Sequence, residues 1–127
     1  MSERKVTQEE LVEMTTKYYK VVEDLYGYSK HHESTPYIHL SDEDKETLKG
    51  EYCYILNEII IYYKNISSEE DLIRTLIHEY QHYLQSPSWM TRYYRQGYAY
   101  DNHPYEVEAL QEEENWYKIW KQVSENC

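Results

Sequence analysis

The chain has 127 residues, a length that predicts a single domain over residues 1–127 with enough material to bury a core. Its formal net charge of -11 argues against binding to nucleic acid or to an anionic membrane surface, because both contacts need clustered lysine and arginine. No apolar run approaches the roughly 18 residues of a membrane span, and the charged N-terminus lacks the apolar region of a signal peptide. The sequence therefore predicts a cytoplasmic protein, and its two cysteines, Cys53 and Cys127, suit a reducing compartment.

The first predicted element is a helix over residues 7–27. Thr7 and Glu10 have the spacing of an N-terminal capping box, and Gly27 is placed to end the helix. Apolar residues recur between them at steps of three and four, as on one face of a helix: Leu11, Met14, Tyr18, Val21, Val22 and Leu25. This helix is expected to be scaffold.

Residues 37–40 predict a short strand, and residues 51–64 predict a β-hairpin or two adjacent strands. The second stretch is rich in β-branched and aromatic residues, with Asn57 and Glu58 between its two apolar runs. An edge strand beside a catalytic helix can bind a peptide as one further strand, which gives this sheet a possible use.

A second helix is expected from about Ser68 to Gln85, opened by a capping box of Ser67 and Glu70 and ended before Pro87. Its apolar side is predicted to contain Leu72, Leu76, Tyr80 and either Tyr83 or Leu84. A last helix begins near Pro104 and fades near Ser124. The expected fold is therefore α+β, a minimal domain with about three main helices and a small sheet or β-hairpin.

The second helix contains the sequence His78-Glu79-x-x-His82. Residues four apart lie one turn above each other, so His78 and His82 can direct their imidazoles at a single ion. Glu79 is turned away from that line and can instead reach a metal-bound water, whose pKa zinc lowers from about 15.7 to about 7. This pattern is typical of metalloproteases, although a solvated polar helix face produces the same letters by chance.

A catalytic zinc site usually has three protein ligands, so a third is required. The candidates that follow the motif are Asp101, His103, Glu106 and Glu108. The chain lacks the glycine-containing extension that supplies a third histidine in metzincins.

The two motif helices resemble the gluzincin type of zincin metallopeptidase, in which a glutamate from a later helix completes the site. Glu106, with Ala109 three residues on and Pro104 two residues before, matches the downstream Glu-x-x-Ala pattern. The resemblance implies that His78, His82 and Glu106 hold one zinc ion and that Glu79 is the general base. Many gluzincins have an acidic residue four positions after the ligand, where this chain has Leu110. Counting from Glu108 instead gives Glu112, which keeps Glu108 as an alternative ligand.

The same resemblance implies a tyrosine or histidine that stabilises the oxyanion. We expect Tyr100 to stabilise the oxyanion, with Tyr98, Tyr105 and His103 as alternatives. The sequence as a whole predicts a zinc metallopeptidase that hydrolyses a peptide or protein substrate. The alternative is a non-enzymatic or regulatory binding protein that keeps the metal site on a zincin-like fold.

Overall fold

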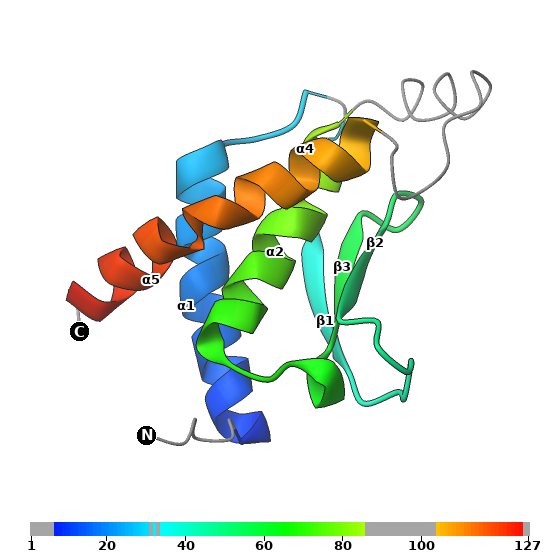
Figure 1. Ribbon diagram of the computed structural model, residues 1–127. Helices are drawn as coiled ribbons and strands as arrows, with labels where there is room; N and C mark the ends of the chain where they lie inside the picture. Colours follow the sequence, from blue (N-terminus) through cyan, green and yellow to red (C-terminus); the bar gives the residue numbers. More distant parts are fainter. Residues whose placement is uncertain (1–6, 31, 33, 86–103, 126–127) are drawn as a thin grey trace.

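The structure is a computed structural model that describes residues 7–30, 32, 34–85 and 104–125. Its elements in chain order are α1 (Gln8–Tyr26), β1 (Tyr37–Ser41), β2 (Gly50–Cys53), β3 (Glu58–Tyr62), the 3-10 turn η1 (Tyr63–Asn65), α2 (Glu69–Leu84), α4 (Pro104–Glu112), the 3-10 turn η2 (Glu113–Asn115) and α5 (Trp116–Glu125). This arrangement confirms the predicted α+β fold of minimal size (Figure 1). None of the described helices combines the length and apolar character needed to cross a bilayer.

Helix α1 has the two ends that its sequence predicts. The Thr7 hydroxyl accepts a hydrogen bond from the Glu10 backbone N–H at 3.2 Å, which satisfies one of the free donors of the first turn. Gly27 follows the helix with a φ of 76°, a left-handed conformation that costs glycine little.

The sheet has the strand order β1-β3-β2. The hairpin is confirmed, since β2 and β3 are antiparallel, and Asn57 in its turn has a φ of 48°. β2 ends at Cys53 and β3 begins at Glu58, so the turn covers residues 54–57 rather than the predicted Asn57 and Glu58, and it takes in Tyr54 and Ile55 of the first apolar run. The parallel pairing of β1 with β3 was not predicted, because the sequence of a strand does not specify which other strand it pairs with.

The cap of α2 lies one residue later than predicted. Ser68 is the N-cap, and its hydroxyl accepts from the Asp71 N–H at 3.1 Å. The Asp71 carboxylate accepts from the Ser67 N–H at 2.9 Å. Asp71 therefore takes the place that the prediction gave to Glu70, although its carboxylate binds the residue before the N-cap rather than the N-cap itself. Glu70, the predicted partner, instead accepts from Arg74 at 2.8 Å.

The core lies between α1, α2, the continuous segment of α4, η2 and α5, and one face of the sheet. Figure 1 shows α4 and α5 crossing α1 and α2, while α2 lies between α1 and the hairpin. From α2, Leu72, Leu76 and Tyr80 are fully buried, as predicted, and they meet Ile59 and Ile61 of β3. Each such side chain contributes about 1.5–3 kcal/mol on burial, so packing rather than helix propensity fixes α2 in place.

Gly50 lets β2 approach α2 closely. A Cβ at this position would lie 2.7 Å from Thr75 Cγ2 and 3.1 Å from the Ile60 carbonyl oxygen. The Thr75 methyl group is held in place because the Thr75 hydroxyl donates to the Asp71 carbonyl at 2.8 Å. Alanine at Gly50 would therefore force the strand and the helix apart.

We expect Gly50→Ala to lower the free energy of unfolding by about 1–3 kcal/mol. Adding Thr75→Ser removes the clashing methyl group but keeps the hydroxyl, so the double variant should recover most of that loss. Urea unfolding of the wild type, the two single variants and the double variant measures both effects. A double variant no more stable than Gly50→Ala would contradict the close contact.

Candidate metal centre

His78 and His82 lie one turn apart on α2 and face α4. Their side chains are 14% and 9% exposed, and their ring centroids are 5.1 Å apart. Helix periodicity alone brings the two imidazoles together, as the sequence predicts. What periodicity cannot supply is the element that covers them.

Glu106 of α4 supplies the third group. One carboxylate oxygen lies 3.0 Å from His78 Nε2, and the other lies 2.7 Å from His82 Nε2. Ala109, one turn further along α4, is fully buried, and its small side chain suits the close packing of α4 on α2. Glu108, the alternative ligand, is exposed and accepts from Gln85 Nε2 at 3.3 Å. The structure thus brings Glu106, and not Glu108, to the histidines.

The three side chains fit a divalent metal ion. Each offers one ligand atom, and these atoms lie within 4.8 Å of one another. A tetrahedral ion with bonds of about 2.0–2.1 Å needs its ligand atoms about 3.4 Å apart, so small side-chain adjustments suffice. Two imidazoles and a carboxylate are also a donor set that catalytic zinc sites use.

Each histidine is held at its other nitrogen by a residue that the sequence analysis did not identify. His78 Nδ1 lies 2.8 Å from a Glu113 carboxylate oxygen, and His82 Nδ1 lies 2.8 Å from the Gln85 side-chain oxygen. Donation from Nδ1–H to these acceptors leaves both Nε2 atoms free to bind an ion. Glu113 is seven residues after Glu106, two helical turns along, and this spacing is the signal that could have found it.

The pKa values reflect the crowding of charges in the metal-free cluster. Burial opposes protonation of His78, but its bonds to Glu106 and Glu113 outweigh burial and raise its pKa to about 10. Burial disfavours the Glu106 charge, yet both histidines together hold the Glu106 pKa well below its usual value. The Glu106 contribution to stability is therefore lost as pH falls below about 4.5, and that of His78 is lost as pH rises through about 10.

Glu79 lies beside the cluster without joining it. It is 7% exposed, and burial raises its pKa to about 7, with the two histidines opposing that rise. A cleft of about 380 Å³ is lined by Glu79 and His78 together with Lys45, residues 47–49 and Gly50. The cluster therefore adjoins a cleft rather than a closed core. The Glu79 carboxyl group, with its raised pKa, borders both the cluster and the cleft.

The interaction of Glu113 with His78 gives a direct test of the cluster. Glu113→Ala removes the acceptor that orients His78, so we expect zinc affinity to fall by about 10–100-fold. Glu114→Ala is the matched control, because Glu114 is 77% exposed and contacts only Arg74 among these residues, at 3.6 Å. Competition titration with a chromogenic chelator measures both variants. Equal affinities would show that Glu113 does not position the histidine.

The predicted oxyanion residue, Tyr100, lies outside the described residues, as do its alternatives Tyr98 and His103. Tyr105 lies in α4, but its side chain is not among those described.

Comparison with protein-family models, with curated proteins and with solved structures found no match. The chain itself provides a group of two partly buried histidines and one buried glutamate, with HExxH spacing, that can hold a metal ion.

Proposed function

We propose that the protein is a zinc-dependent metallopeptidase that hydrolyses a peptide or protein substrate. The observation that carries this proposal is the convergence of His78, His82 and Glu106 beside a buried glutamate and an adjoining cleft. Among the described residues the group offers three ligand atoms, the number that catalytic zinc sites use when one position remains for water or substrate.

A bound zinc ion would polarise the substrate carbonyl and lower the pKa of a coordinated water to about 7. Glu79 takes a proton from the attacking water and then delivers it to the nitrogen of the leaving amine. Glu79 is suited to both steps by its place, because its carboxyl group is buried beside the cluster and lines the cleft that adjoins it. Glu113 and Gln85 hold the imidazoles in the orientation that the reaction requires.

Strand β2 is the edge strand next to this cleft. Its first residue, Gly50, lines the cleft together with Glu79 and packs against Thr75 of α2. An extended substrate can form main-chain hydrogen bonds with such an edge. This pairing positions the peptide bonds of the substrate without specific contacts to each of its side chains. A preference for unfolded or extended substrates follows.

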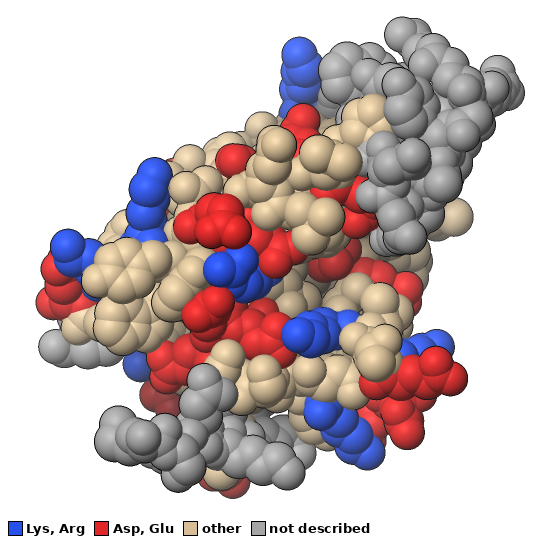
Figure 2. All heavy atoms as spheres, in the orientation of Figure 1, with Lys and Arg blue, Asp and Glu red and all other residues tan. Residues whose placement is uncertain are grey.

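The protein has a formal net charge of -11, and Figure 2 shows Asp and Glu side chains in several patches on the face of Figure 1, among uncharged side chains and some Lys and Arg. The basic residues of the cleft are themselves paired, Lys45 with Glu43 at 3.3 Å, Lys49 with Asp71 at 2.7 Å and Arg74 with Glu70 at 2.8 Å. Strongly acidic substrates should therefore be poor ones.

Zinc content and hydrolysis of unfolded casein test the proposal together. We expect about one zinc ion per chain by elemental analysis, hydrolysis that stops on treatment with a chelator, and recovery when zinc is restored. Stoichiometric zinc with no hydrolysis of casein or of proteins in a cell lysate would instead support the regulatory binding protein. A protein that binds no zinc at any concentration of added zinc would contradict both the metallopeptidase and the regulatory binding protein.

A further inference from the structure

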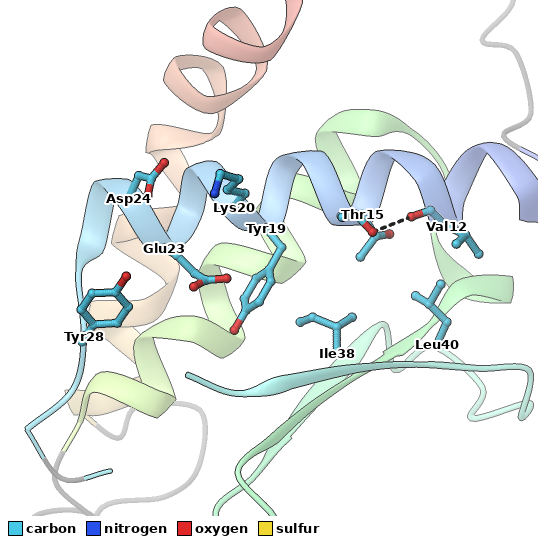
Figure 3. Close-up of a pocket in the computed structure, with 10 residues that line it drawn as sticks. Val12, Thr15, Tyr19, Lys20, Glu23, Asp24, Tyr28, Ile38 and Leu40 are labelled. Carbon is cyan, nitrogen blue, oxygen red and sulfur yellow. Dashed lines mark hydrogen bonds between the residues drawn. The ribbon is translucent and has the colours of Figure 1, made fainter. Parts of the chain in front are cut away.

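A second hollow lies at the edge of the sheet away from β2. It has a volume of about 420 Å³, and all of its lining residues belong to α1, to Tyr28 or to β1. Figure 3 shows Ile38 and Leu40 of β1 directed toward α1, with Val12 above Leu40. The proposed peptidase mechanism uses none of these residues. We call this hollow the α1–β1 groove.

The backbone of β1 is available along this groove. In the strand order β1-β3-β2, β1 is an edge of the described sheet. The Tyr37 N–H donates to the Asn57 carbonyl at 3.0 Å, on the β3 side. Because backbone groups alternate along a strand, the N–H and C=O groups of Ile38 and Leu40 point away from β3. The groove therefore combines a strand edge that no other described strand pairs with and the apolar side chains of Val12, Ile38 and Leu40.

The other end of the groove is lined by Glu23, Asp24 and Lys20, two negative charges and one positive, so its net charge is negative. Figure 3 shows Tyr19 and Glu23 reaching from α1 toward β1, whereas Lys20 and Asp24 point away from the strand. The Tyr19 hydroxyl donates to the Pro36 carbonyl at 2.7 Å. Burial raises the Glu23 pKa and the Asp24 charge adds to the effect, while the Lys20 charge and a hydrogen bond with Thr35 oppose it. The net negative charge favours a cation at this end. Tyr28, 74% exposed, adds an aromatic ring that can contact such a cation.

We propose that the α1–β1 groove binds an extended peptide that pairs with β1 and carries two apolar side chains followed by a lysine or arginine. The strand hydrogen bonds come from Ile38 and Leu40, the apolar contacts from Val12 and Tyr19, and the charge contact from Glu23. This site is separate from the metal cluster and does not depend on the proposed peptidase function.

The length of the groove is close to that of such a peptide. Val12 and Glu23 are eleven residues apart, which is about 16.5 Å along α1 at 1.5 Å per residue. In a strand, side chains at i, i+2 and i+4 point to one side and span about 13–14 Å, and the remaining distance of about 3 Å is within the reach of a lysine or arginine side chain. Antiparallel pairing, the more stable kind, runs the peptide from the Val12 end to the Glu23 end, which places the basic residue last.

The probe is a fluorescein-labelled hexapeptide, Val-Thr-Val-Thr-Lys-Thr, with a second version that carries glutamate in place of lysine. The full chain carrying Glu79→Gln serves as the background throughout, so that the probe is not hydrolysed. We expect Glu23→Lys to weaken binding of the lysine probe by about tenfold and to strengthen binding of the glutamate probe by a similar factor. Glu13→Lys is the matched control, because Glu13 also lies on α1, is 72% exposed and does not line the groove, and it should change either affinity by less than about twofold.

Amide hydrogen exchange locates the bound probe. The Ile38 and Leu40 amides should become protected in the complex, and Glu23→Lys should reduce that protection. Pairing of the same peptide with β2 in the proposed peptidase cleft would protect β2 amides independently of Glu23. Three results would overturn the proposal: no binding of either probe, equal effects of Glu23→Lys and Glu13→Lys, or no protection at β1. The substitutions at positions 13 and 23 leave the metal ligands and the cleft unchanged, so a failure here leaves the proposed peptidase function unaffected.

Discussion

Replacing Glu79 with glutamine is expected to lower peptide hydrolysis by about 10²–10⁴-fold while leaving the metal content unchanged. Glutamine has nearly the same size as glutamate, so the site where Glu79 is 7% exposed can accept it without repacking. It cannot take a proton from water, and this is the step that the proposed mechanism assigns to Glu79. The metal should remain, because the three ligand atoms come from His78, His82 and Glu106.

Steady-state hydrolysis of unfolded casein and elemental analysis of the same samples measure the two effects separately. Glu114→Gln makes the same chemical change at a side chain that is 77% exposed, and it should retain full activity. Hydrolysis that persists in Glu79→Gln would remove Glu79 from the mechanism. Loss of metal together with activity would show instead that Glu79 is needed for the site to form.

Removal of the third ligand should have the largest effect on metal binding. We expect Glu106→Ala to lower zinc affinity by more than about 100-fold, beyond the loss expected for an outer partner such as Glu113. The carboxylate of Glu106 contacts both imidazoles, at 2.7 and 3.0 Å, so no other described side chain takes its place between them. Without it, only two nitrogens from a single helix remain to hold the ion.

Glu108→Ala is the matched control, because Glu108 lies on the same helix and contacts Gln85 rather than a histidine. Zinc at 1,000 times its dissociation constant stabilises a folded protein by about 4 kcal/mol. At the same zinc concentration a site weakened 100-fold gains only about 1.4 kcal/mol. The midpoint of thermal unfolding should therefore rise with zinc in the wild type and in Glu108→Ala, and by at most about a third as much in Glu106→Ala. A rise in Glu106→Ala equal to that of the wild type would show that the ion is held elsewhere.

Much of the candidate site can be predicted from the sequence because its key relation is local. His78 and His82 are four residues apart on one helix, and that spacing alone fixes them on one face. The limits of α1 follow from Thr7 and Gly27 for the same reason, since caps act within a single turn. The predicted N-cap of α2, Ser67, is wrong by only one residue. Ser67 and Ser68 both carry a hydroxyl, and the local backbone conformation decides which of them caps the helix.

Glu106 is an intermediate case. The downstream pattern selects it only through its resemblance to a known family, and the residues themselves left Glu108 open. The choice is made where α4 packs on α2: Glu106 is 8% exposed and meets both histidines, whereas Glu108 is exposed. Which face of α4 turns inward depends on contacts with another helix, and the sequence of α4 alone does not state them.

The sequence by itself determined the helices, the hairpin and the pair of histidines, because each depends on residues within about one turn or one strand of each other. Only the tertiary structure decided that β1 lies parallel to β3, that Gly50 brings β2 against α2, and that Glu113 and Gln85 hold the imidazoles. These relations join segments distant in the chain. They are fixed by the packing of a shared core, in which many contacts act together and no single motif records the result.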